Sequence, residues 1–546
     1  MMPQGKYRIM SFKEFVPDKL RFIILVLGAV IFQFSNSTYL ANINETVGGK
    51  ALTDEDIKMI FYASMIGLTM VFPLLFRFKF RLPSRTILLV CSSVVILGNV
   101  TALYCSNVFI LILISFILGF FRMMGTFECF SSINLIITPT RDFSVFYPFI
   151  YMIILGSIQF SGLVNADISY ALNWKYMYVL IVSLQLSFMI IIFTLMRPIL
   201  LMKRIPLYQI DWLGMLLWTV VIFLISFIAE YGERLDWFYS RYIRIATGSC
   251  IILLICAIQR MTGLKRPFIM PEAFAYRNVI KSLVLLFLLE LFISTNTVIM
   301  NAYLGGFLEY NMQHINSLNW IVVVGIVLGT VLSYYWLHVR GGGYKVAFFG
   351  GFACLVLYHF ILYFTFQHSV AKADLYVPYF LYGVGYIVLY IAIVLYAADR
   401  VPFPHFFATL CILGFVRSGI GMPIADSITH NLWHHIQEKN VMLLSLGMDT
   451  VDPTTNSLYG YVFNNAIEAG RSIEEAQSMA TSALYGNVYK QAMLLSWKDI
   501  YGWYTLFGAL VLLGIMFTHY RKPSFPKIRK LKNIWRYARG KVYSNG

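Results

Sequence analysis

Long apolar stretches alternate with short polar connections along the whole chain. The hydrocarbon core of a bilayer is about 30 Å thick, and a helix crosses it in roughly 20 residues. Lipid offers no partner to backbone N–H and C=O groups, so each stretch is expected to be a helix that satisfies its own backbone. We number fourteen such spans in chain order: 20–41, 57–76, 87–105, 108–137, 145–166, 176–196, 212–229, 243–258, 280–304, 318–337, 346–366, 375–397, 406–433 and 501–518. The pattern predicts an all-α polytopic membrane protein with 14 transmembrane helices.

Composition supports this prediction. Hydrophobic residues make up 59% of the chain and charged residues only 13%, which excludes a soluble domain of this length. The seven cysteines all lie within or at the ends of spans and form no CxxC motif. No disulfide framework, metal motif, nucleophile motif or nucleotide loop is implied. We therefore expect no cofactor, no metal and no enzyme activity.

Positive charge falls on one alternating set of connections. Most of the 43 Lys and Arg residues lie before span 1, after even-numbered spans and in the tail 521–546. Because Lys and Arg of short loops stay cytoplasmic, we expect both termini to lie in the cytoplasm. The net charge of +17 is thus explained without nucleic acid. The tail either binds anionic membrane lipid or serves only to fix the topology.

The two halves of the chain are similar in layout. Compact basic loops follow span 2, at 77–85, and span 10, at 338–345. If spans 7 and 8 are an insertion, spans 1–6 and 9–14 form two six-helix bundles that can rock about a site at the membrane midplane. The expected division is a first bundle (1–205), two inserted helices (206–262), a second bundle (263–520) and the basic tail.

Three stretches carry a resemblance to a known family. They are Ile210–Gly214 (IDWLG), Arg234–Phe238 (RLDWF) and the region from Phe415–Gly421 (FVRSGIG) to Trp433, which precedes a long polar segment. In these stretches the chain resembles the EmrB/QacA-type drug:proton antiporters, the 14-helix branch of the major facilitator superfamily. The resemblance implies the major facilitator fold with two extra central helices. It also implies proton-driven export across the plasma (inner) membrane, with a periplasmic adaptor and an outer-membrane channel docked to residues 434–500.

The chain departs from that family at several motifs. Where the family has an acidic residue midway along helix 1, this chain has Asn36, which we take as a substrate-cavity candidate. The family's Arg-x-x-x-Gly motif of helix 4 has no match in register, and Arg122 lies further along. The chain therefore resembles a divergent member, and its coupling ion is left open.

Charges inside the spans are the main site signal, because an ionised side chain in lipid must be paired or face water. In span 4, Arg122 and Glu128 lie about 9 Å apart along the helix and on different faces. Each is expected to need a partner on another helix. We predict a coupling role for Glu128 and a charge-compensating role for Arg122. The alternative is a structural ion pair between helices.

Glu290 lies near the middle of span 9 and is a second proton-coupling candidate. A buried carboxyl with only a hydrogen-bonding role is the alternative. The polar residues that follow include Asn296 and Asn301, which either contact substrate or hold helices together.

Span 13 carries Arg417 and a polar stripe formed by Asp426, His430 and His434 at i, i+4 and i+8. Arg417 matches the family's arginine and is assigned to gating or charge compensation. Asp426 and His430 are candidates for a proton path. The stripe could also hold Zn²⁺, and the other alternative is a polar helix extension that leads into the segment 434–500.

Further candidates lie in and just after span 12. Its tyrosines share one helical face, which offers flat apolar surface with hydroxyl groups to an amphipathic ligand, or packs against another helix. The stripe consists of Tyr379, Tyr382, Tyr386 and Tyr390. Asp399 and Arg400, at the cytoplasmic end, are expected to gate or anchor.

Together these features predict a secondary transporter, a proton-coupled exporter of small hydrophobic or amphipathic compounds by alternating access. Two alternatives stay open: a facilitator or importer of a small metabolite, and a non-transporting membrane component of an envelope assembly. In the polar segment 434–500, Ser472 and Glu475 are spaced as a capping box, so one or two helices are expected outside the membrane.

Overall fold

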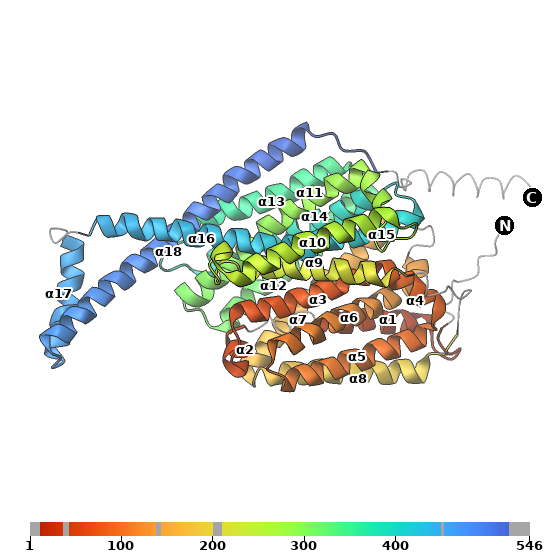
Figure 1. The fold of residues 1–546 in the computed structure, drawn as a ribbon, viewed down its shortest axis with the longest axis horizontal. Coiled ribbons are helices and arrows are strands. Elements are labelled where there is room, and N and C mark those ends of the chain that lie inside the picture. Colours follow the sequence, from red (N-terminus) through yellow and green to blue (C-terminus); the bar gives the residue numbers. More distant parts are fainter. Residues whose placement is uncertain (1–10, 36–42, 138–142, 200–209, 449–452, 524–546) are drawn as a thin grey trace, which may run out of the picture.

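The structure, a computed structural model, describes residues 11–35, 43–137, 143–199, 210–448 and 453–523 (Figure 1). Across these ranges the regular structure is helical, as the apolar pattern predicts. The predicted cavity residue Asn36 and residues 524–546 of the basic tail lie outside the described residues.

The helices follow one another with short connections. Those of the first part of the chain are α1 (Asp18–Phe34), α2 (Ile43–Lys50), α3 (Asp54–Met70), α4 (Leu75–Arg81), α5 (Ser84–Tyr104), α6 (Val108–Ile137), α7 (Phe143–Ala171) and α8 (Lys175–Leu195). Those of the second part are α9 (Trp212–Tyr231), α10 (Arg241–Gly263), α11 (Arg277–Thr295), α12 (Met312–Tyr334), α13 (Tyr344–Thr365), α14 (Tyr376–Ala398), α15 (Phe403–Gly414), α16 (Met422–Leu446), α17 (Pro453–Glu468) and α18 (Ile473–Phe517). A 3-10 turn, η2 (Trp237–Tyr239), and two π-helical segments, η4 (Asn296–Met300) and η8 (Phe415–Gly421), matter for the site.

Thirteen helices or helix runs among the described residues are long and apolar enough to cross a membrane. The predicted first span, 20–41, corresponds to α1, whose 17 residues are followed by residues outside the described ranges. With α1 included, the predicted count of 14 agrees with the structure. Span 13 runs through α15, η8 and α16 without a break.

The helices fall into two packed groups (Figure 1). In the first, α6 packs against α1, α3 and α5, and α8 packs against α5. In the second, α14 packs against α11, α12 and α13, and α18 packs against α13 and α16. The groups meet where α7 packs on α12 and where α3 packs on η8, while α9 contacts both α3 and α16. The residue boundaries of the two bundles and the insertion stay a prediction.

Glycines bring helices into close contact within each group. A Cβ on Gly119 of α6 would lie 1.8 Å from the Ser64 carbonyl oxygen of α3, so the two backbones touch. In the second group, a Cβ on Gly325 of α12 would lie 2.6 Å from the Phe380 carbonyl oxygen of α14. Close approach through small residues is a common way for membrane helices to associate.

The IDWLG stretch has a local structural role. Asp211 caps α9 by accepting a 2.9 Å hydrogen bond from the Gly214 backbone N–H. The same carboxylate lies 2.7 Å from Arg260 Nη2 of α10. One side chain therefore both starts α9 and fixes α10 beside it.

The segment 434–500 is helical, as expected, and its helices are continuous with the predicted spans 13 and 14. It consists of the extension of α16 to Leu446, the short helix α17 and the first part of α18. No proline interrupts Ile473–Phe517, so α18 runs for 45 residues directly into the predicted last span. The capping box is confirmed: Ser472 Oγ accepts from the Glu475 N–H, and the Glu475 side chain accepts from the Ser472 N–H. Figure 1 shows α17 projecting at the end of the molecule opposite α4 and α15.

Candidate functional site

An ion pair links the second group of helices near the middle of two spans. Glu290 of α11 places Oε1 3.8 Å from Nε of Arg417, which lies in the π-helical η8. The Glu290 side chain is 3% exposed and that of Arg417 16%. π-Helical segments are rare and occur frequently at functional sites. The sequence nominated both residues separately, and the structure brings them together.

The tyrosine stripe of α14 faces this pair. Arg417 Nη2 donates a 3.1 Å hydrogen bond to the hydroxyl of Tyr386, and its Cζ lies 4.3 Å from the ring centroid of Tyr390. A guanidinium at that distance is attracted by the ring face. Tyr382 continues the stripe by stacking on Tyr386 at 6.3 Å. The arginine is therefore held by a carboxylate, a hydroxyl and an aromatic face at once.

Two residues of α7 complete the cluster from the other group of helices. Tyr151 contacts Tyr390 edge-on, with ring centroids 4.8 Å apart, and Tyr147 stacks on Tyr151 at 5.7 Å. Sequence reasoning missed both, although their i, i+4 spacing in span 5 repeats the signal used for span 12. The cluster of Tyr147, Tyr151, Tyr386, Tyr390, Glu290 and Arg417 thus spans the boundary between the groups. We call it the central cluster.

The polar residues that follow Glu290 differ in their surroundings. Asn296 accepts a 3.2 Å hydrogen bond from the hydroxyl of Tyr358 on α13. Asn301, by contrast, donates to the Thr297 carbonyl of its own helix run and is exposed. Tyr379 is buried one turn before Tyr382. Asn296 and Asn301 are therefore in different environments, although the sequence grouped them.

The two charges of α6 are not part of the central cluster. Glu128, 1% exposed, forms a 3.1 Å ion pair with Lys79 of α4, which confirms a partner on another helix. Arg122 is also 1% exposed, and within the described residues its Nε and Nη2 have no hydrogen-bond partner. Neither residue is paired with Glu290 or Arg417.

The polar residues predicted to form a stripe on span 13 contact different parts of the structure. Asp426 accepts hydrogen bonds of 2.8 Å from Tyr62 of α3 and 3.0 Å from Thr297. His430 and His434 turn instead toward Glu233, in the hairpin between α9 and α10. The common face is confirmed, but a single continuous path along it stays a prediction.

Comparisons with known proteins bear on the fold alone. No protein-family profile and no curated protein matches the sequence. Three similar solved structures are a mutant of the nucleoside transporter NupG (TM-score 0.51, 10% identity, 92% of this chain and 100% of that chain), an auto-inhibited POT family peptide transporter (0.53, 14%, 93% and 98%) and a POT peptide transporter mutant in complex with alafosfalin (0.54, 13%, 93% and 98%). The chain has the major facilitator fold.

In this major facilitator fold, Asp399 and Arg400 lie at the end of α14, away from the central cluster. The Asn278 side chain donates to the carbonyls of Tyr396, Ala397 and Asp399 at 2.9–3.0 Å and so caps this helix end. Arg400 has a left-handed backbone, with φ of 62°. Both residues are thus placed at a helix terminus, where the sequence put them, and their gating role stays a prediction.

Proposed function

We propose that this chain is a secondary active transporter that works by alternating access, with the Glu290–Arg417 pair as its coupling element. The observation that carries the proposal is the central cluster, in which Tyr151 of one helix group packs on Tyr390 of the other, the ring that Arg417 faces. Transporters with repeated bundles place their sites near the midplane, at the interface between the repeats. Glu290 is residue 14 of the 31-residue run Arg277–Phe307, close to its middle.

The pair offers a physical route for proton coupling. A buried carboxylate beside a guanidinium is tolerated because the two charges compensate each other. When Glu290 takes up a proton it loses its attraction for Arg417, which keeps Tyr386 and the ring of Tyr390 as partners. A cationic or hydrogen-bond-donating group of a substrate would instead bind the ionised Glu290 carboxylate, with Arg417 balancing the charge. Proton and substrate would thereby compete for one carboxylate, as exchange requires.

The tyrosines suggest the class of substrate. Their rings present flat apolar surface and their hydroxyls present hydrogen-bonding groups, which suits small aromatic or amphipathic compounds. We propose export of such compounds in exchange for protons, in the manner of the EmrB/QacA-type antiporters that the sequence resembles. Import of a small metabolite is the second candidate. It is favoured by Asn36, which replaces the family's acidic residue, and by the nucleoside and peptide transporters among the similar structures.

Reconstitution into liposomes tests coupling and direction together. An inward or outward pH gradient is imposed, and the accumulation of a panel of amphipathic dyes, nucleosides and peptides is measured. We expect Glu290→Gln to abolish gradient-driven accumulation while exchange of internal for external substrate persists. Glu272→Gln, an exposed carboxyl on another segment, is the matched control and should keep both activities. Undiminished gradient-driven accumulation in Glu290→Gln would exclude this residue as the coupling acid.

The projecting α17 and the first part of α18 are the segment we propose for docking an adaptor protein. Exposed apolar side chains occur on both helices, among them Tyr461 at 68%, Met479 at 49% and Tyr485 at 62%. Removal of residues 447–488 with a short linker should abolish an adaptor complex and leave flux in liposomes intact. Loss of flux as well would show that the projection serves the transporter itself.

A further inference from the structure

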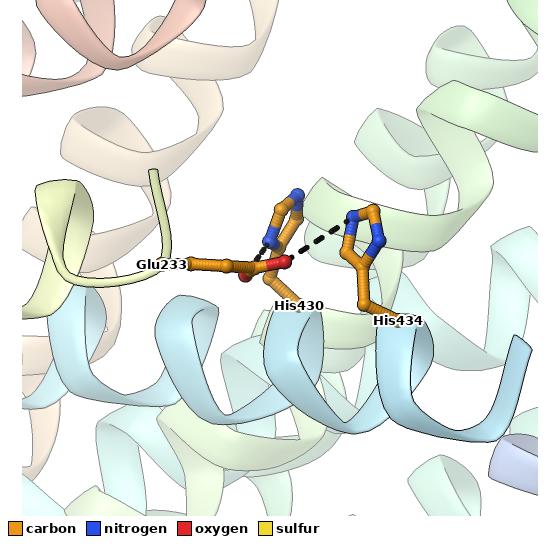
Figure 2. Close-up of side chains that lie close together, drawn as sticks. All are labelled: Glu233, His430 and His434. Carbon is orange, nitrogen blue, oxygen red and sulfur yellow. Dashed lines mark hydrogen bonds and ion pairs between the residues drawn. The ribbon is translucent and has the colours of Figure 1, made fainter. Parts of the chain in front are cut away.

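The hairpin between α9 and α10 places Glu233 against two histidines of α16 (Figure 2). Glu233 Oε2 lies 2.6 Å from His430 Nδ1, and its Oε1 lies 3.6 Å from His434 Nε2. The ligand-type atoms of the three side chains are all within 4.8 Å of one another. No other group of His, Cys, Asp or Glu in the described part of the chain has this spacing.

Contacts within α16 and contacts between the hairpin and α16 fix the positions of the three side chains. His430 and His434 are one helical turn apart, and their ring centroids are 4.5 Å from each other. The hairpin is tied to the same helix by a 3.2 Å hydrogen bond from Trp237 Nε1 to Asn431 Oδ1. Asp236 and Trp237 have φ values of 54° and 49°, a conformation that non-glycine residues rarely adopt. The hairpin therefore holds a specific, strained shape beside α16.

We propose that Glu233, His430 and His434 bind one divalent transition-metal ion of the Zn²⁺ type. Two imidazoles from one helix and a carboxylate are a recurring zinc ligand set. Metal–ligand bonds of about 2.0–2.2 Å in tetrahedral geometry place ligand atoms roughly 3.3–3.6 Å apart, within the range observed here. The side chains are 30%, 37% and 43% exposed, so an ion can reach them and a fourth position is open to water.

The surrounding charges favour a cation. Glu230, one turn before Glu233 in sequence, interacts electrostatically with His430 and with Asp426. The compensating charge on Glu230 comes from Lys58, 3.1 Å away. Glu230 and Asp426 thus share this one ammonium group, and Glu233 adds a further carboxylate beside the histidines. A bound divalent ion would balance this excess and join the inserted hairpin to α16, the helix that continues from the segment carrying Arg417.

Metal binding to the purified full-length protein in detergent tests the site without any transport assay. After treatment with a chelator, we expect the protein to take up one equivalent of Zn²⁺ in a calorimetric titration. His430→Ala and His434→Ala should each weaken binding more than about 10-fold, because each removes one of only three protein ligands. His435→Ala, the exposed neighbour on the same helix, is the matched control and should bind as the wild type does.

X-ray absorption spectroscopy of the zinc-loaded wild type provides a second test that depends on no variant. The expected spectrum contains two imidazole ligands and light oxygen scatterers, without sulfur. A zinc ion bound elsewhere on the protein would show a different set of coordinating atoms. The proposal is overturned by any of three results: no stoichiometric uptake by the wild type, wild-type affinity in both histidine variants, or a spectrum without imidazole.

Discussion

The Tyr62 hydroxyl donates a 2.8 Å hydrogen bond to the Asp426 carboxylate and so joins α3 of one helix group to α16 of the other. A hydrogen bond to a charged group contributes about 1.5–3 kcal/mol. We expect Tyr62→Phe to favour states in which α3 and α16 are apart by roughly 10-fold or more. Pulsed electron resonance between spin labels at the exposed positions 48 and 442 measures their separation. Tyr104→Phe, with a ring that is 82% exposed, should leave the distance distribution unchanged.

The buried carboxylate of Glu128 depends on the ammonium group of Lys79. Replacing Lys79 with Met leaves a charge that is 1% exposed without its partner. Breaking a buried pair in this way costs about 3–5 kcal/mol. We therefore expect Lys79→Met to lower the thermal unfolding midpoint in detergent clearly, and Lys265→Met, at an exposed lysine, to leave it in place.

The double variant Lys79→Met/Glu128→Gln separates charge from packing. Because it removes both charges, it should recover most of the stability lost in Lys79→Met. A double variant as unstable as the single one would show that Lys79 acts through its contacts with other groups, such as Ser131.

Gly119 and Gly350 form a matched pair for close helix packing. A Cβ on Gly119 would meet the Ser64 carbonyl oxygen at 1.8 Å, whereas a Cβ on Gly350 of α13 has no atom within 4 Å. Gly119→Ala should destabilise the protein by about 1–3 kcal/mol, as overpacking does. Gly350→Ala should be neutral or stabilising by up to about 1 kcal/mol, because Gly is a poor helix former. Equal unfolding midpoints for the two variants would contradict the close contact of α3 and α6.

The buried Lys50 lies outside the candidate spans, and we expect it to make the free energy of unfolding depend on pH. Burial lowers the pKa of its ammonium group from 10.5 to about 8, while Cys105 opposes the shift. The side chain donates to the carbonyls of Ala102 and Cys105 and lies over the Trp174 ring. Since the unfolded chain holds this proton up to a higher pH, unfolding takes up a proton between pH 8 and 10.5.

The contribution of Lys50 to stability should therefore be least favourable below pH 8 and should improve as the pH rises from 8 to 10.5. Other groups titrate in this range, so the informative quantity is the difference between wild type and Lys50→Met. We expect that difference in unfolding midpoint to change steadily across this interval. A difference that is constant with pH would mean that Lys50 keeps its usual pKa in the folded protein.

Apolar run length was sufficient to predict the helices, because the bilayer imposes both a length and internal hydrogen bonding on every span. The pairing of charged residues on different helices was not predictable in the same way. Glu290 and Arg417 were both recognised as buried charges, but nothing in the local sequence indicates that α11 and η8 face each other. Contacts between residues 127 positions apart depend on how the helices pack.

The pairing of His430 and His434 with Glu233 could not be predicted either. Their spacing was visible in the sequence, but the third member, Glu233, comes from a hairpin whose position is set by Trp237 and Asn431.

The start of α18 could not be predicted from hydropathy. Hydropathy marks where a helix enters lipid and carries no information about how far the same helix continues into water.

Because α18 continues beyond its predicted span, a small tilt of this helix displaces its far end by a large distance. The part from Ile473 to residue 500 is about 42 Å long as a helix, so a tilt of about 10° at the membrane would displace its tip by about 7 Å. Any rocking of the second bundle would therefore be magnified at α17. Under the proposed alternating-access function, a partner bound at α17 would be displaced mechanically by each change of conformation.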